Sequence, residues 1–285
     1  EIAQCLVGSE MCIRDSNYTV FNTYEICAIE ISGKDVLRKR NLVRPAEKRY
    51  NVYKCSPWNQ ITKGEKKIMA FVHLHTHTEY SLLDGSNKIK EYVSRVKELG
   101  MNSAAITDHG NMYGVVEFYK TAKAADINPV IGCEIYVAPN SRFDRETSHG
   151  EDRYYHLILL AENNTGYANL MKIVSIGFTE GYYYRPRVDF ETLQKYHEGL
   201  ICLSACLAGE VPRYIVRGFY EEAKGIAKKY QACFGKDNYF LELQDHGIPD
   251  QKTVNQGLLR ISQELDIPLV CTNDIHYTYE TDVEA

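Results

Sequence analysis

The chain has 285 residues, of which 44% are hydrophobic and 25% charged, and it carries a formal net charge of −5. This composition is typical of a soluble globular protein with one large or two ordinary domains. No apolar run approaches the roughly 18 residues of a membrane-spanning helix, and no signal peptide is recognisable, so a membrane protein is excluded and we expect a cytoplasmic one.

The charge is divided unevenly along the chain. Residues 1–68 carry 12 Lys/Arg and 8 Asp/Glu, a net of +4, so the remainder carries −9. A domain that acidic repels nucleic acid at long range unless cations or a local basic patch intervene. The nine cysteines show neither a C-x-x-C motif nor a regular spacing. We therefore expect reduced thiols in the cytosol, with one of them a candidate metal ligand.

Residues 1–68 do not have the pattern of a domain, because their short apolar stretches lack a sustained helical or strand period. Within them, residues 5–16 resemble a translated sequencing adaptor. We predict that 1–68 are a non-domain extension, either read-through ahead of a start at Met69 or disordered, and that the domain occupies 69–285. The alternative is a basic arm that binds an acidic partner through residues 38–40.

From Met69 onwards, apolar runs of strand length alternate with amphipathic stretches of helix length. This alternation predicts an α/β fold of parallel strands joined by right-handed crossovers. Seven such units fit a closed or nearly closed barrel, since no glycine-rich dinucleotide turn follows the first strand. The expected strands are 71–75, 103–107, 130–137, 156–161, 200–204, 239–243 and 269–272. The expected helices are 87–99, 115–125, 165–178, 190–196, 219–234 and 250–265.

The first expected helix begins after Ser86, a residue type that often caps helices. Its apolar residues recur at helical spacing and should share one buried face. These residues are Ile89, Tyr92, Val93 and Val96.

An H-x-H motif closes the first expected strand. Because side chains alternate along extended backbone, His75 and His77 should project to one face, where two imidazoles can bind one divalent cation. Asp84, beyond a turn, could add an oxygen ligand. On its own the motif is also explained by loop histidines that are merely hydrogen-bonded.

Further candidate ligands lie near the ends of the other expected strands. In parallel α/β barrels the reactive groups collect at the C-terminal strand ends. A hydrophobic core does not require this many ionisable side chains, because burying an ionisable group is costly unless the group is paired or binds a metal. We therefore predict a multinuclear metal site, although His156 stands at the start of its strand and fits this rule less well. The other candidates are Asp108, His109, Glu134, Cys206, Asp274 and His276.

Taken together, these residues resemble the complete ligand set of the polymerase and histidinol phosphatase (PHP) domain family. The runs 71–81 and 238–243 are similar to the branch of the family that opens the alpha subunit of bacterial DNA polymerase III. The resemblance covers residues 69–285 and implies a distorted seven-stranded, TIM-like barrel with the metal site at the C-terminal ends of the strands. Polymerase palm, fingers and thumb are not part of this stretch.

The resemblance also implies a role for each ligand. Three divalent ions are expected, with Zn²⁺ favoured by the imidazole and thiolate ligands and Mn²⁺ or Fe as alternatives. His75, His77, Glu134 and Asp274 would hold the first ion and form the catalytic group. Glu134 would bridge to a second ion held by His156 and Cys206. The residues expected to hold the third ion are Asp84, His109 and His276.

By resemblance, the chain would belong to a DNA-directed DNA polymerase and would carry a 3′→5′ proofreading exonuclease. Two alternatives stay open: a small-molecule phosphatase of the histidinol phosphate kind, and a non-catalytic scaffold of the polymerase. The implied partners are DNA, the rest of the polymerase chain and other replicase subunits such as the sliding clamp.

Two further sets of residues could assist the site. Tyr183, Arg185 and Arg187, in an expected loop, could stack on bases and grip phosphates; the alternative is a packed loop that covers the barrel. Side chains that could orient the metal ligands are Asp108, Ser204 and Asn273.

Overall fold

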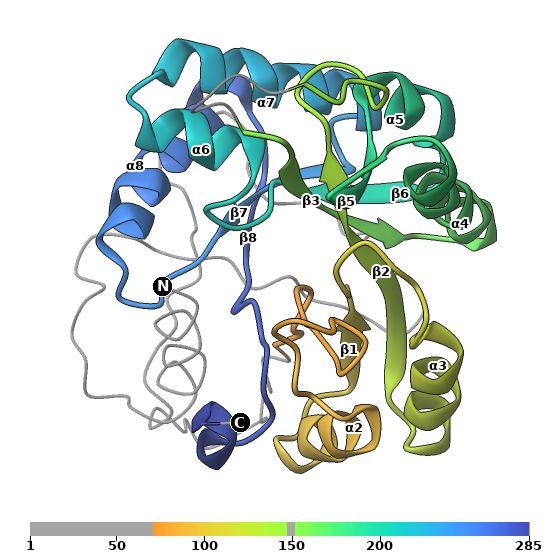
Figure 1. The fold of residues 1–285 in the computed structure, drawn as a ribbon. Helices are drawn as coiled ribbons and strands as arrows, with labels where there is room; N and C mark the ends of the chain where they lie inside the picture. Colours follow the sequence, from red (N-terminus) through yellow and green to blue (C-terminus); the bar gives the residue numbers. More distant parts are fainter. Residues whose placement is uncertain (1–70, 147–151, 285) are drawn as a thin grey trace.

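The computed structural model describes residues 71–146 and 152–284, which form one α/β unit around a curled sheet (Figure 1). The predictions for residues 1–68 lie outside the described residues. The strands are β1 (Ser103–Ile106), β2 (Asn128–Val137), β3 (Tyr155–Ala161), β4 (Tyr182–Tyr183), β5 (Arg185–Val188), β6 (Leu200–Leu203), β7 (Tyr239–Leu243) and β8 (Leu269–Cys271).

The sheet is mixed, and the prediction that all its strands are parallel is wrong. Its order is β4-β5-β2-β3-β6-β7-β8, with β1 also paired to β2. The pairs β1–β2, β6–β7 and β7–β8 are parallel, whereas β3 runs antiparallel to both β2 and β6. Reversing one strand brings its N-terminal end to the edge where its neighbours have their C-terminal ends.

The first expected strand, 71–75, is not a regular strand, but residues 73–77 form backbone hydrogen bonds to neighbouring segments on both sides, as a strand would. The His77 amide donates to the Ile275 carbonyl (2.7 Å) and the Ala105 amide donates to the His73 carbonyl (3.1 Å). This segment therefore lies between β1 and the chain that follows β8 (Figure 1). Together with β1, β2, β3, β6, β7 and β8, it makes seven extended segments that close a distorted barrel, and the short strands β4 and β5 are attached to it through β2.

The helices match the expected ones with three exceptions, of which the first is the unexpected 3₁₀ turn at the C-terminal end of the described residues. Residues 210–216 form a short helix that the sequence did not indicate, and α2 is not capped by Ser86, whose hydroxyl donates to the His276 carbonyl instead (3.2 Å). The predicted face of α2 is buried as expected. The helices are α2 (Ile89–Glu98), α3 (Val115–Ala124), α4 (Asn164–Thr179), α5 (Phe190–Tyr196), α6 (Glu210–Val216), α7 (Tyr220–Phe234), α8 (Pro249–Leu265) and the 3₁₀ turn η1 (Glu280–Glu284).

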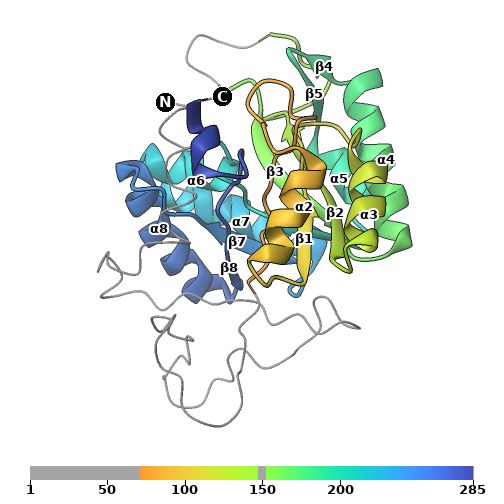
Figure 2. The same cartoon turned by 90° about the horizontal axis from the view of Figure 1, so that it is seen from below.

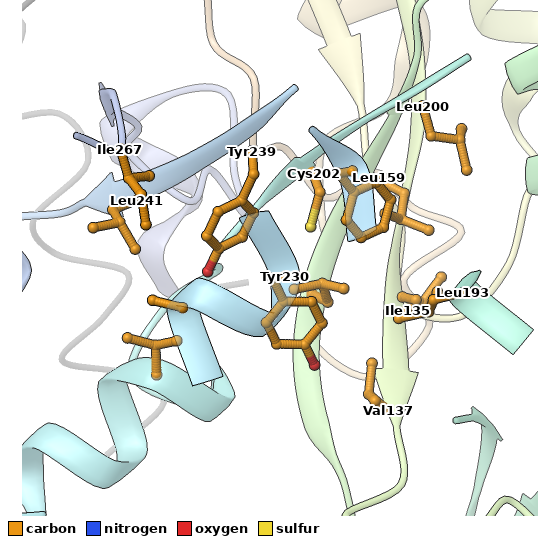
Figure 3. Close-up of a cluster of buried hydrophobic side chains, with 14 of the residues drawn as sticks. Ile135, Val137, Leu159, Leu193, Leu200, Cys202, Tyr230, Tyr239, Leu241 and Ile267 are labelled. Carbon is orange, nitrogen blue, oxygen red and sulfur yellow. The ribbon is translucent and has the colours of Figure 1, made fainter. Parts of the chain in front are cut away.

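A large apolar cluster fills the space between the sheet and helices α4 to α8 (Figure 3). The rings of Tyr230 and Tyr239 stack inside it with centroids 5.8 Å apart. Full burial of each aliphatic side chain contributes about 1.5–3 kcal/mol. We call this set the apolar cluster; Figure 3 labels Ile135, Val137, Leu159, Leu193, Leu200, Cys202, Tyr230, Tyr239, Leu241 and Ile267.

Within the described residues, every helix is too short or too polar to cross a membrane.

Candidate metal centre

His75 and His77 lie together at the edge of the barrel, as the two-residue period predicts. Both are completely buried, and their Nε2 atoms are 3.1 Å apart. Asp274 comes from the chain after β8 and places its Oδ1 atom 3.0 Å from His75 Nε2 and 3.2 Å from His77 Nε2. Its backbone is left-handed, with φ of 46°, a strained conformation that turns the carboxylate toward the histidines.

Hydrogen bonds to the Nδ1 atoms of His75 and His77 leave the Nε2 atom of each ring facing the centre. Glu242 accepts a hydrogen bond from His75 Nδ1 (2.7 Å). Ser81 donates to Asp108 (2.9 Å), so its oxygen accepts from His77 Nδ1 (3.0 Å). In the neutral rings, both Nε2 lone pairs therefore point at one another. Such lone pairs repel unless a cation lies between them, and a carboxylate–histidine pair of this kind is typical of metal ligands.

Glu134, on β2, faces four imidazoles at once. Its Oε1 atom lies 3.0 Å from His156 Nδ1 and 3.4 Å from His75 Nε2. Its Oε2 atom lies 2.6 Å from His109 Nδ1 and 3.5 Å from His77 Nε2. A fully buried carboxylate shared in this way has the position of a bridging ligand.

The strand reversal explains why His156 reaches this edge from the beginning of its strand. In the antiparallel register of β2 and β3, His156 pairs with Tyr136, two residues from Glu134 on the same face. His156 does not fit the strand-end rule for parallel barrels because β3 runs antiparallel to its neighbours.

Asp84 and His276 lie on the other side of His109. His109 Nε2 is 3.1 Å from Asp84 Oδ2, and His276 Nε2 is 3.9 Å from the same oxygen. The rings of His109 and His276 each stack on His77, at 4.1 and 4.4 Å. His276 Nδ1 lies 2.8 Å from the Asp274 carbonyl, and if it donates there the Nε2 lone pair is directed into the centre.

Cys206 follows β6 and the left-handed residue Ala205, but the structure places it outside the tightest groupings of ligand atoms. Burial raises the pKa of its thiol well above the usual value, and the carboxylates of Asp274 and Glu134 raise it further. A thiolate here would need a neighbouring cation.

Several buried polar atoms of the centre lack hydrogen-bond partners within the described residues, although they face one another closely. They include Asp84 Oδ1, His109 Nδ1, Glu134 Oε2 and Asp274 Oδ1. Unsatisfied buried polar atoms are costly, and carboxylate oxygens with imidazole nitrogens are ligands that divalent metals prefer. The residues thus fit a metal cluster. Three groups have ligand atoms within 4.8 Å of one another: His75, His77 and Glu134; His109, Glu134 and His156; His77, His109 and His276.

Without a cation, protons on histidine balance the carboxylates. Burial opposes protonation of His75, but Asp274, Glu242 and Glu134 outweigh it and raise the pKa of His75 well above 6.5. In the same way, burial of His109 is outweighed by Glu134 and Asp84, which raise its pKa to about 10. Burial would raise the pKa of Glu134, but the surrounding histidines lower it well below 4.5. Protons therefore occupy positions that a metal ion would take.

Glu242 is the principal residue that the sequence argument missed. It is buried, and besides His75 it accepts hydrogen bonds from Gln244 (2.9 Å) and from Thr272. A charged residue inside the apolar run of β7 was the available signal. Of the predicted orienting residues, Asp108 binds Ser81, and Ser204 accepts from the Glu242 amide (2.8 Å).

His246 also supports the centre, because its Nε2 lies 2.8 Å from the Asn273 carbonyl, next to Asp274.

The predicted nucleic-acid-binding loop is a hairpin, β4–β5, with left-handed Tyr184 at its tip. Arg187 is buried and donates to the carbonyls of Gly181 (3.3 Å) and Arg153 (3.1 Å), so it holds the hairpin in place and is not free to bind phosphate. Arg185 is half-buried, and Tyr183 lies beneath Arg187.

The chain is thus a curled α/β barrel with histidines and carboxylates clustered at one edge, where they could hold metal ions. The PHP domain family model matches residues 73–246, and the chain belongs to this family.

Its similar relatives include proteins named DNA polymerase III subunit alpha. That of Treponema pallidum is 52% identical over 217 residues, which are 76% of this chain and 18% of the relative. That of Borreliella burgdorferi is 49% identical over 215 residues, 75% of this chain and 19% of the relative. The chain thus spans less than a fifth of the length of these relatives. Among solved structures, an amidohydrolase from Chromobacterium violaceum aligns with a TM-score of 0.48 and 14% identity, covering 72% of this chain and 87% of that one.

Proposed function

We propose that the chain is the PHP part of the alpha subunit of a bacterial replicative DNA polymerase, and that its metal centre hydrolyses phosphodiester bonds from the 3′ end of DNA. The observation that carries the hydrolytic part is Glu134, one buried carboxylate that faces His75, His77, His109 and His156. The identity of the relatives supports the polymerase part.

We infer three divalent ions, with Zn²⁺ favoured and Mn²⁺ or Fe as alternatives. His75, His77, Glu134 and Asp274 would hold the first. Glu134, His156 and Cys206 would hold the second, with His109 close enough to take part. The residues proposed for the third are Asp84, His109 and His276.

Bound there, divalent cations would supply Lewis-acid activation of water and of the phosphoryl group. The residues of the chain prepare the site for that chemistry. Glu242 and Ser81 hold His75 and His77 with their Nε2 lone pairs facing inward. Glu134 is positioned to set the spacing between cations, and burial of the ligands strengthens every charge interaction in the centre.

The partners proposed with this function are DNA and the rest of a polymerase chain, acting in the cytoplasm. Nucleotide addition and contacts with the sliding clamp would belong to parts of such a subunit outside this chain. Domain boundaries at 69–285 are proposed on the same grounds.

A primer with a mismatched 3′ end is the right test substrate, because a frayed terminus enters a single-strand site at low cost. The metal-loaded chain should shorten a 5′-labelled primer stepwise from its 3′ end, and histidinol phosphate should be a poor substrate. Efficient turnover of histidinol phosphate would favour a small-molecule phosphatase. Metal binding without any hydrolysis would favour the alternative that the chain is a non-catalytic, structural domain of the polymerase.

A further inference from the structure

Three exposed aromatic side chains lie in a row: Tyr113, four residues after His109, Phe178 on α4 and Tyr182 on β4. We call them the aromatic row. Their exposed fractions are 63%, 39% and 52%, and neighbouring ring centroids are 6.4 and 6.3 Å apart. Single exposed aromatics are ordinary, whereas a contiguous set usually marks a binding surface. In Figure 2, β4 lies beside α4 at the same edge of the molecule.

The row is joined to the metal centre by the backbone that carries His109. Gly110 follows His109 with φ of 62° and packs so tightly that an added Cβ would lie 2.8 Å from both Tyr136 and Pro186. Tyr136 in turn stacks on His109, with centroids 6.1 Å apart and ring planes 18° apart. One short loop therefore carries a metal ligand at one end and Tyr113, the start of the row, at the other.

Two arginines beside the row have no carboxylate partner among the ion pairs of the described residues. Arg185 lies over the Tyr136 ring, 5.7 Å from its centroid, and within hydrogen-bonding reach of Tyr154. Arg145 donates to the backbone carbonyls of Tyr182 and Glu180. The nearby Arg142, by contrast, is held by Glu180 at 2.8 Å and Asp189 at 2.9 Å. In an acidic domain, guanidinium groups without a carboxylate partner favour an anionic ligand. Arg145 differs from the buried Arg187 because it is exposed, so its guanidinium is accessible to a ligand although it also donates to carbonyls.

We propose that the aromatic row, with Arg145 and Arg185, binds single-stranded nucleic acid whose 3′ end lies in the metal centre. This inference rests on the proposed function and names the form of its substrate. Aromatic faces stack on bases of any sequence, and arginines bind the phosphates between them. Continuity with the centre through His109, and the positive charge, favour a nucleic acid over a second protein as the occupant.

The test is the binding of a fluorescent, phosphorothioate single strand to the metal-loaded full chain, followed by anisotropy. Phe178→Ala and Tyr182→Ala should each weaken binding about 5-fold or more, the range found for one base–aromatic stack. The matched control is Phe219→Ala, because Phe219 is 50% exposed and lies outside the row. Arg145→Ala should weaken binding and lower its salt dependence. Its control is Arg260→Ala, which removes an arginine that stacks on Tyr220 at 4.1 Å.

Hydrolysis of bis-para-nitrophenyl phosphate separates this inference from the proposed function. Wild type, Phe178→Ala and Tyr182→Ala should cleave this small diester equally, because it is too short to span the row. The inference would be overturned if wild type did not bind the strand, or if both variants bound it as tightly as wild type does. In the second case, a protein partner would be the better candidate for binding the aromatic row. If the aromatic row bound the strand but the chain cleaved no diester, the inferred strand binding would stand and the proposed nuclease function would be overturned.

Discussion

The metal centre and the apolar cluster lie in one barrel but bury opposite kinds of side chain. In the apolar cluster, Leu159, Leu200 and Leu241 pack on other apolar side chains, and burial itself stabilises them. In the metal centre, His75, His77 and Glu134 are just as buried, yet burial penalises their charged forms. The apolar cluster is thus stable on its own, whereas the centre depends on protons or cations. Changes at the centre should therefore affect metal binding and rate, while matched changes in the apolar cluster should not.

The largest effect is expected for Glu134→Gln, which keeps the shape of the side chain but removes the charge that four imidazoles share. Hydrolysis should fall at least on the order of 10²-fold, as for the loss of a key electrostatic stabiliser. Glu210→Gln is the matched control, since Glu210 is a largely buried carboxylate that accepts from Tyr230 (2.8 Å) and is not one of the candidate ligands. Primer-shortening rates measure both, and equal rates for the two variants would contradict the role of Glu134.

Glu242→Gln should have the next largest effect. Glutamine can still accept from His75 Nδ1 but lacks the negative charge that strengthens this imidazole as a ligand. Metal affinity, measured by isothermal titration calorimetry, should fall about 10- to 100-fold, with a smaller change in melting temperature. An unchanged affinity would mean that Glu242 only fills space behind the ligands.

A smaller effect is expected from pH on the metal-free chain. The pKa of His109 is raised to about 10 in the folded state, against 6.5 unperturbed. The stabilisation from this shift is complete below the unfolded-state pKa and is lost as pH rises from about 6.5 towards 10. Metal binding replaces that proton, so the metal-loaded chain should not show this loss.

Urea midpoints of chelated and Zn²⁺-loaded protein across this range measure the difference. Parallel pH profiles for the two forms would show that His109 is not a proton-bearing residue of the centre. Chelation should also lower the melting temperature at neutral pH, and Zn²⁺ or Mn²⁺ should restore it.

The smallest effect is expected from removing residues 1–68. A chain that begins at Met69 should keep its melting temperature and unfolding cooperativity, because the removed part lacks a periodic apolar face that could dock. Differential scanning calorimetry of both chains is the measurement. A drop of several degrees on trimming would show that these residues belong to the fold.

The sequence predicted the elements well, because periodicity is a local property. The buried face of α2 and the apolar runs of β3 and β7 could be read directly. The strand directions could not, since the orientation of β3 depends on pairing with residues far along the chain. The hairpin β4–β5 was missed because its residues alternate neither as strand nor as helix.

The candidate metal ligands could be selected from the sequence because several strand ends carry the same few residue types, and the structure brings most of these residues within a few ångströms of one another. His156 and Glu242 show the limits of that argument. The place of His156 follows from a strand reversal, and the role of Glu242 follows from the orientation of one imidazole nitrogen. Arg187 was misjudged because only its burial shows that its guanidinium is used on backbone carbonyls.

Whether divalent cations occupy the centre can be measured by anomalous X-ray diffraction from crystals of the Zn²⁺-loaded chain. We expect strong peaks between the Nε2 atoms of His75 and His77 and beside Glu134, with a further peak near Asp84 and His276. Density that shows these side chains bonded only to one another, with no anomalous peak in the centre, would contradict this expectation.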